Sequence, residues 1–268
     1  MKILFFGDII GQPGREAIKK ILPQWKEKYS PDLILANGEN LAHGLGITEK
    51  SLNEVLAAGI DLVTSGNHVF DKIEAINLLE NKDIPLLRPA NYPPSVSGRG
   101  YQIVEIGVKK ILVINLNGRL FFKESLDCPF RKVDEILEEY QDEKINATLV
   151  DFHAEATSEK KAMGYYLDGR VTAVLGTHTH IPTADAKILP SGTAYISDVG
   201  MVGPMNSVIG MDKEMAIKGY LTQIPPGKGE KGKLAEGPVE ANAVLIEIDD
   251  KTNLAKKIER IEQIVELD

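Results

Sequence analysis

Residues 2–14 read KILFFGDIIGQPG, and this stretch decides the fold class. A short apolar run ends at Gly7 and Asp8. Pro13 then suits the first turn of a helix, because its fixed φ is helical and it needs no N–H partner there. The same order recurs twice, since the apolar runs at 32–36 and 61–65 each end in polar residues and each precede a helical pattern. Strands that alternate with helices predict βαβ units and a parallel sheet, so we expect an α/β protein.

The middle of the chain predicts a second sheet. Two apolar runs flank a turn at Gly107 and indicate a hairpin of strands 101–106 and 110–116. The remaining expected elements are a helix at 133–140 and strands near 147–152, 171–175, 184–189, 193–197 and 241–248.

Two features of the predicted elements stay open. Pro23 either kinks the first helix or breaks it. The tail 254–267 fits no single pattern, because its isoleucines are three residues apart. We expect residues 1–268 to form a single domain, since neither a repeat nor a linker is visible. The Gly-rich stretch 225–238 predicts a surface loop, and a cap or lid over a substrate within 200–240 is the alternative.

The composition narrows the class of function. The 268 residues carry a formal net charge of −8, which argues against an extended nucleic-acid-binding surface. The single cysteine, Cys128, excludes an intramolecular disulfide and is typical of a reducing compartment. The first apolar run is too short for a signal sequence, and no run approaches the length of a membrane span. The sequence therefore predicts a cytoplasmic protein without a membrane partner.

Polar side chains of a related kind follow the predicted strands. Four of the five histidines lie at strand ends, together with two carboxylates and two carboxamides. These side chains are ligands for divalent metals, and α/β proteins bind ligands beyond the carboxyl ends of their strands. In an extended stretch, His178 and His180 would point to one face. The candidate residues are Asp8, Glu39, Asn40, Asn67, His68, His153, His178 and His180.

Each candidate also has an interpretation without function. Asp8 could cap the next helix, residues 66–68 could be a turn, and His153 could be a core histidine. Residues 39–40 and 177–180 could be surface loops. A shared site is the better interpretation, because all of them fall at one expected edge of a sheet. The fifth histidine, His43, is expected to be a solvated loop residue, and neither a GxSxG nor a GxxxxGK[ST] motif occurs.

The order of these motifs resembles the YmdB family of the calcineurin-like metallophosphoesterases. Two positions depart from the broad superfamily. Ile10 stands where a histidine is usual, and Glu39 stands where an aspartate is usual. Asn40 can supply the missing ligand through its carbonyl oxygen, and the YmdB subgroup is similar in this respect. The matching stretches, within residues 5 to 204, are FFGDIIGQPGR, NGENLAHGLGIT, TSGNHVFD, DFHAEATSEK, GTHTHIPTAD and ISDVGMVGP.

The resemblance implies a four-layer αββα sandwich of two mixed sheets. It also implies two divalent metal ions per chain, and the chemistry of the ligands favours Fe or Mn. It implies that Glu39 bridges the ions and that His68 is free to act as an acid. Asp71 either orients His68 or is merely an acidic residue at a helix start. The implied ligands are Asp8, Glu39, Asn40 and His180 for one ion, and Glu39, Asn67, His153 and His178 for the other.

The function implied by the resemblance is a phosphodiesterase. It would hydrolyse a cyclic nucleotide of the 2′,3′-cAMP or 3′,5′-cAMP type by in-line attack of a hydroxide that bridges the two ions. The alternatives are a phosphomonoesterase or protein phosphatase, a regulatory nucleotide-binding protein with little turnover, and a metal-free structural module. The expected partner is therefore a small nucleotide phosphodiester, and a homo-oligomer is left open.

Overall fold

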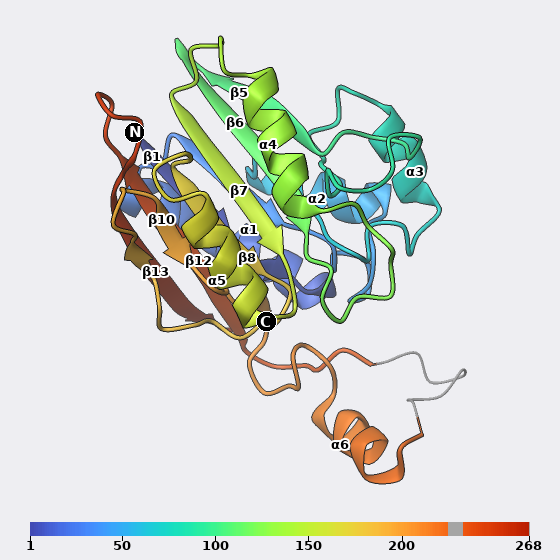
Figure 1. Ribbon diagram of the computed structural model, residues 1–268. Helices are drawn as coiled ribbons and strands as arrows, with labels where there is room; N and C mark the ends of the chain where they lie inside the picture. Colours follow the sequence, from blue (N-terminus) through green and yellow to red (C-terminus); the bar gives the residue numbers. More distant parts are fainter. Residues whose placement is uncertain (225–232, 268) are drawn as a thin grey trace.

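Two β-sheets lie face to face in the computed structural model, which describes residues 1–224 and 233–267 (Figure 1). The first sheet contains, in spatial order, β2 (Asp8–Ile9), β11 (Met201–Pro204), β12 (Val239–Ile248), β1 (Lys2–Phe6), β3 (Leu33–Asn37) and β4 (Leu62–Thr64), with β13 (Ala255–Val265) paired to β12. The second contains β5 (Tyr101–Ile106), β6 (Lys109–Asn117), β7 (Ala147–His153), β8 (Ala173–Thr177), β10 (Ala194–Ile196) and β9 (Lys187–Ile188).

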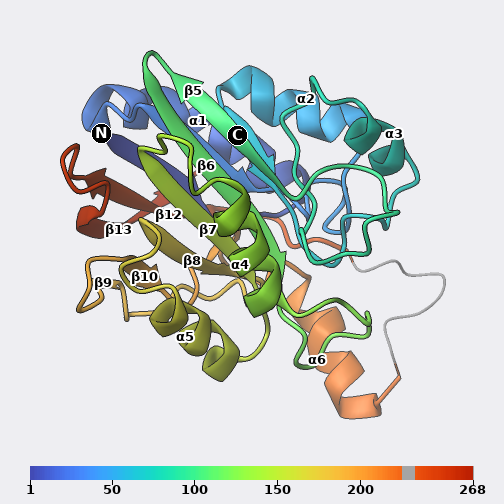
Figure 2. The same cartoon turned by 45° about the horizontal axis from the view of Figure 1, so that its top comes forward.

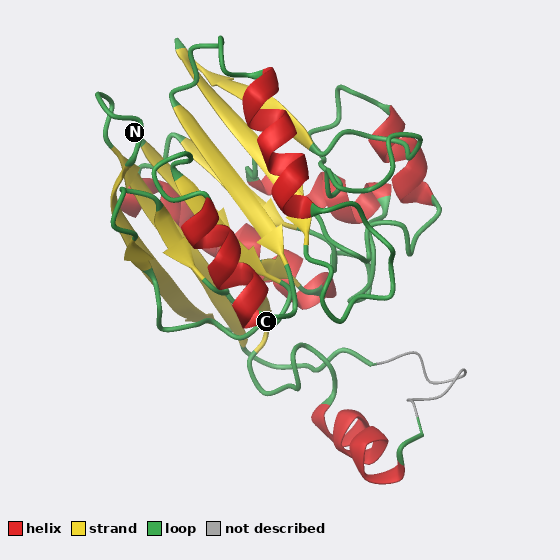
Figure 3. Ribbon diagram, in the orientation of Figure 1, coloured by secondary structure: helices red, strands yellow, loops and turns green. Residues whose placement is uncertain are grey.

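Helices cover the outer face of each sheet (Figure 3). The first sheet carries α1 (Gly11–Tyr29), α2 (Glu49–Ala58) and α3 (Glu74–Glu80), and the second carries α4 (Pro129–Glu139) and α5 (Thr157–Tyr166). Both sheets mix parallel and antiparallel pairs, because β1 pairs with β3 in parallel and with β12 in antiparallel, and β6 pairs likewise with β7 and β5. The predicted four-layer αββα sandwich is therefore confirmed.

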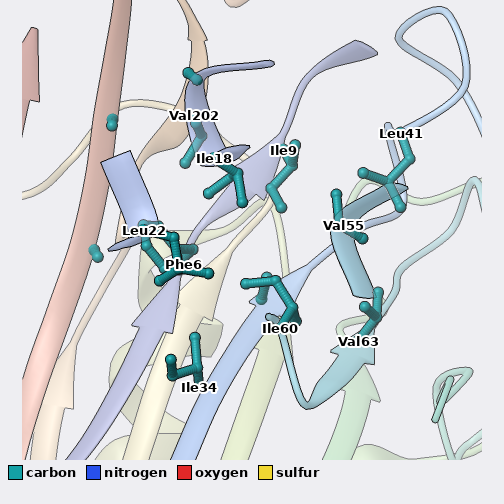
Figure 4. Close-up of a cluster of buried hydrophobic side chains, with 14 of the residues drawn as sticks. Phe6, Ile9, Ile18, Leu22, Ile34, Leu41, Val55, Ile60, Val63 and Val202 are labelled. Carbon is teal, nitrogen blue, oxygen red and sulfur yellow. The ribbon is translucent and has the colours of Figure 1, made fainter. Parts of the chain in front are cut away.

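Buried apolar side chains form three clusters, one at each interface between successive layers of the αββα sandwich. In β1 the side chains of Leu4 and Phe6 face the helices, and Figure 4 shows Phe6 within this cluster of buried side chains. The Phe6 ring stacks on Trp25 with centroids 5.2 Å apart. The alternate residues Ile3 and Phe5 face the second sheet. A central strand buried on both sides explains why its sequence is continuously apolar rather than alternating.

Local sequence signals set the ends of the first helices. Thr48 caps α2 through a hydrogen bond from the Ser51 N–H, and Gly59 ends it at a φ of 110°. Glycine takes this left-handed conformation without steric cost, so both predicted ends of α2 are confirmed. Pro23 does not end α1, which continues to Tyr29.

Three expected elements differ in the structure. The ambiguous tail is the edge strand β13, which pairs with β12 from Val239–Val265 to Ile248–Ala255. Backbone pairing with β12 determines this strand, since its side chains follow no strict alternation. The strand expected at 184–189 is reduced to Lys187–Ile188, and the one expected at 171–175 lies two residues later, at Ala173–Thr177.

The segment after β11 was not placed by the sequence. It contains α6 (Lys213–Thr222), which projects from the sandwich and buries none of its side chains (Figure 2). Most of the loop expected at 225–238 falls at 225–232, outside the described residues. A lid within 200–240 and a single domain stay predictions. None of the described helices is long and apolar enough to cross a membrane.

Candidate metal centre

The polar residues predicted at strand ends meet at one place in the fold. The parallel strands β1, β3 and β4 end there from one sheet, and β7 and β8 end there from the other. Among the described residues, two groups of metal-ligating atoms lie within 4.8 Å of one another: Glu39 with His153 and His178, and Asp8 with Glu39 and His180. Residues far apart in the sequence are brought together because the carboxyl ends of parallel strands share an edge.

Glu39 belongs to both groups and lies between them. Its side chain is 1 % exposed. Oε1 lies 3.1 Å from His153 Nε2 and accepts a 3.2 Å hydrogen bond from Asn40 Nδ2. Oε2 accepts a 3.1 Å hydrogen bond from the His68 backbone N–H. Oε1 therefore lies between His153, which belongs to one group, and Asn40, which contacts His180 of the other group.

Asp8 carries an unsatisfied buried oxygen. The residue is fully buried, and within residues 1–224 and 233–267 its Oδ1 has no hydrogen-bond partner. Oδ1 lies 3.9 Å from His180 Nε2 and 3.8 Å from His153 Nδ1, while Oδ2 accepts a hydrogen bond from the His178 N–H. An unpaired buried carboxylate oxygen is costly, and a cation beside it would remove that cost.

The other side of the centre brings lone pairs together. His153 Nε2 lies 3.0 Å from His178 Nδ1 and 3.2 Å from the Asn67 side-chain oxygen. On the first side the amide nitrogen of Asn40, not the carbonyl oxygen expected as a ligand, faces the centre: Nδ2 lies 3.2 Å from His180 Nε2. All eight predicted residues thus lie in or against the centre. This set of carboxylate, carboxamide and imidazole donors fits divalent metal ions.

Outer hydrogen bonds fix which nitrogen each histidine presents to the centre. His180 Nδ1 donates to the Ile209 carbonyl at 3.0 Å, which leaves Nε2 facing Asp8. His178 Nε2 pairs with Glu155 at 3.0 Å, which leaves Nδ1 facing inward. Such second partners fix the ring orientation and tautomer of metal-binding histidines.

The third histidine is held by residues that the sequence analysis missed. His153 Nδ1 lies 2.9 Å from Thr177 Oγ1, whose hydroxyl donates to Asp151 at 2.7 Å. Asp151 also accepts hydrogen bonds from Thr64 and Asn37 and is almost fully buried. A signal existed, because Asp151 lies two residues before His153 in β7 and so shares its face.

The stretch that carries His178 and His180 is not extended, so that expectation was wrong. β8 ends at Thr177, and the two histidines have φ angles of 99° and 65°. Strained left-handed residues of this kind persist where the surrounding structure holds them, often at functional sites. Here Thr179, between them, donates its N–H and hydroxyl to Asp198, which also pairs with the buried Lys160 at 2.7 Å.

Burial and close charges shift the pKa values of the cluster. Burial raises the pKa of Asp8 to about 6 and lowers that of His178 to about 3. Burial alone would raise the pKa of Glu39, yet the charge and hydrogen bond of His153 outweigh it and lower the pKa to about 2. For His153, burial opposes the charged form, but Glu39 prevails and raises the pKa to about 9. Each buried charge thus depends on an opposite charge in contact with it.

His68 lies beside the centre but in neither group of ligands. Its side chain is 31 % exposed, and Nδ1 lies 2.8 Å from Asp71 Oδ2. The predicted contact with Asp71 is therefore present. A histidine held by a carboxylate through one nitrogen has its other nitrogen free to exchange a proton.

Comparisons with known proteins agree with the resemblance seen in the sequence motifs. The family described as YmdB-like protein matches residues 4–261. A Bacillus subtilis protein named 2′,3′-cyclic-nucleotide 2′-phosphodiesterase is 48 % identical over 97 % of this chain and 96 % of its own. A solved structure of a hypothetical protein from Thermus thermophilus has a TM-score of 0.90 and 42 % identity, covering 98 % of this chain and 99 % of its own.

A solved structure described as a novel phosphatase from Mycoplasma pneumoniae has the same TM-score of 0.90 at 36 % identity, covering 99 % of this chain and 94 % of its own. The matches span the sandwich and every strand end that contributes to the centre. The resemblance inferred from the motifs is therefore confirmed.

Proposed function

Since the chain belongs to the YmdB-like family, we propose that it is a metal-dependent phosphodiesterase that hydrolyses nucleoside 2′,3′-cyclic phosphates. The observation that carries the proposal is the place of Glu39, which both groups of candidate ligands share, next to a histidine paired with a carboxylate. The name of the 48 % identical B. subtilis relative supports the choice of substrate. A 3′,5′-cyclic nucleotide is the second substrate to be tested.

In this proposal the chain would hold two divalent ions, and Glu39, which both groups of candidate ligands share, would be a ligand of each. When bound, the ions supply positive charge to the phosphoryl group and acidity to the attacking water. Fe and Mn suit the donors, since no thiolate is among them. The proposed ligands are Asp8, Glu39, Asn40 and His180 on one side, and Glu39, Asn67, His153 and His178 on the other.

The proton balance of the reaction assigns a role to His68. The hydroxyl group of water joins phosphorus and its second proton is released to solvent. The P–O bond to one ribose oxygen breaks, so that oxygen needs a proton. The His68 imidazolium would donate it from Nε2, while Nδ1–H stays bonded to Asp71. Asp71 is thus a positioning residue, because its carboxylate holds the His68 ring and acts on the reaction through it.

The first test joins metal content with turnover. We expect protein purified without chelator to contain about two ions per chain and to convert 2′,3′-cAMP to a nucleoside monophosphate. EDTA should abolish the activity, and Mn²⁺ or Fe²⁺ should restore it. Elemental analysis and chromatography of the product measure both. At most one ion per chain, with no gain on adding Mn²⁺, would overturn the two-metal proposal.

A phosphatase is the second candidate, because the M. pneumoniae neighbour is described as one. Rates on p-nitrophenyl phosphate, 2′,3′-cAMP and 3′,5′-cAMP separate the candidates. A higher kcat/KM on the monoester would favour the phosphatase. Nucleotide binding without any product would favour the regulatory alternative.

A second prediction concerns the support of His153. Thr177→Val removes the hydroxyl that accepts from His153 Nδ1 and donates to Asp151. We expect the affinity for one ion to fall by about 10–100-fold, because partners of this kind set ligand orientation and basicity. A chelator-competition titration measures this loss. The matched control is Thr172→Val, another buried threonine with two hydrogen bonds but outside the centre, which should keep the affinity of the parent protein.

A further inference from the structure

A pocket of about 440 Å³ opens directly beside the candidate metal centre. His180 and Asp71 form part of its wall, so it adjoins both a proposed metal ligand and the residue that holds His68. Its volume falls within the range of about 300–1,000 Å³ that is usual for small-molecule sites.

The wall is apolar, with two unpartnered polar groups. Ile10, Leu45, Ile209, Met211 and Leu234 provide the apolar surface. His43 and Lys72 also line the pocket, and in the described part of the chain neither side chain forms a hydrogen bond or ion pair. An apolar cavity with a few polar groups free to point inward is the usual composition of a site for an organic ligand.

The backbone around the pocket is held in costly conformations. Three of its non-glycine lining residues, His43, His180 and Ile209, have φ angles of 55°, 65° and 49°. Ile209 is also the residue whose carbonyl orients His180. Such conformations gather at ligand clamps, where packing enforces them.

We propose that this pocket binds the nucleoside portion of the substrate, an inference that rests on the function proposed above. The phosphoryl group would lie at the metal centre, and the ribose oxygen that leaves would lie near His68 and Asp71. The base would then extend between Leu45 and Ile209, where its faces contact apolar carbon. His43 and Lys72 would reach the nitrogen and oxygen atoms of its edge.

The opposite side of the centre offers a different surface. There Phe122 lies over His178, with centroids 4.9 Å apart, beside the exposed residues Leu120 and Phe121. We favour the pocket because it encloses a ligand, whereas the Phe121 ring is 84 % exposed. If the base binds in the pocket, a substitution at Leu45 should weaken nucleotide binding. If it binds on the Phe122 side, a substitution at Leu120 should do so instead.

The test compares two substrates that share a reacting ring. Nucleoside 2′,3′-cyclic phosphate and glycerol 1,2-cyclic phosphate both contain the five-membered cyclic diester, and only the first has a base. In Leu45→Ala we expect the ratio of their kcat/KM values to fall about 10-fold, through KM for the nucleotide, because a hydrophobic pocket discriminates by about this factor per lost contact. His43→Ala should lower the same ratio.

Leu120→Ala is the control, since Leu120 and Leu45 are both 48 % exposed. Its ratio should stay within about twofold of the parent protein. A direct readout is the binding of adenosine, followed by NMR titration. We expect saturation of Leu45→Ala to need at least fivefold more adenosine than saturation of the parent protein. An unchanged ratio in both pocket variants, or an equal fall in Leu120→Ala, would overturn the inference. If the parent protein hydrolysed neither diester, the proposed function itself would fail.

Discussion

Glu39→Gln is expected to lower metal content at both sites and to reduce kcat/KM for 2′,3′-cAMP by at least about 10³-fold. The amide removes the charge that the two groups of ligands share, at a position that is 1 % exposed and contacts His153 and Asn40. In the two-metal proposal each ion would contribute several kcal/mol of transition-state stabilisation, and 1.36 kcal/mol corresponds to a factor of ten in rate. Elemental analysis and steady-state kinetics measure the two losses.

The matched control for this variant is Glu159→Gln. Glu159 is also buried, but its carboxylate accepts hydrogen bonds from the Arg119 and Leu120 N–H groups and belongs to neither group of ligands. We expect this control to keep two ions and to turn over within a few-fold of the parent protein. A Glu39→Gln variant with near-normal turnover would show that Glu39 does not bridge the ions.

His68→Ala is expected to keep both ions and to lower the rate on 2′,3′-cAMP by about 10²–10⁴-fold, the usual contribution of a general acid. His68 lies outside both groups of ligands, and its ring nitrogen Nδ1 is held by Asp71. The loss should be smaller on a p-nitrophenyl phosphodiester, because p-nitrophenolate leaves as a stable anion and scarcely needs a proton.

His153→Ala is the comparison that separates the acid from the ligands. His153 is fully buried within the centre, so its removal should lower metal content and should reduce the rate on both substrates alike. If His68→Ala lost metal and lost equal activity on both substrates, His68 would be a ligand rather than the acid. Metal analysis and kinetics on the two substrates give both answers.

The alternation of strands and helices in the first 90 residues could be read from the sequence because its signals are local. Continuous apolar runs mark strands buried on both faces, as Ile3 to Phe6 are. The N-cap at Thr48 and the glycine end at Gly59 depend only on neighbouring residues, and both lie where they were predicted. The candidate metal ligands were found for the same reason, because they follow the strands directly.

Elements that depend on distant partners were not predicted. β13 is a strand because it pairs with β12, and no pattern of its own side chains requires that. α6 was missed for a different reason: its apolar residues are not gathered on one face, so it lacks the pattern by which an amphipathic helix is recognised. Residues 178–180 were expected to be extended, and this was wrong. Thr179 forms hydrogen bonds to Asp198, which is paired with Lys160, and these distant contacts hold the loop in its turned conformation.

The sequence by itself determined the α/β class and the residues that meet at the candidate metal centre, because hydrophobic periodicity and polar strand ends depend on neighbouring positions. The tertiary structure alone decided which nitrogen each histidine presents, through Ile209, Glu155 and Thr177. His43 is exposed and lies in a loop, as the sequence predicted, and the tertiary structure also places it on the wall of a pocket with His180. These relations join residues more than 20 positions apart, and only the packing of two sheets brings such residues within a few ångströms.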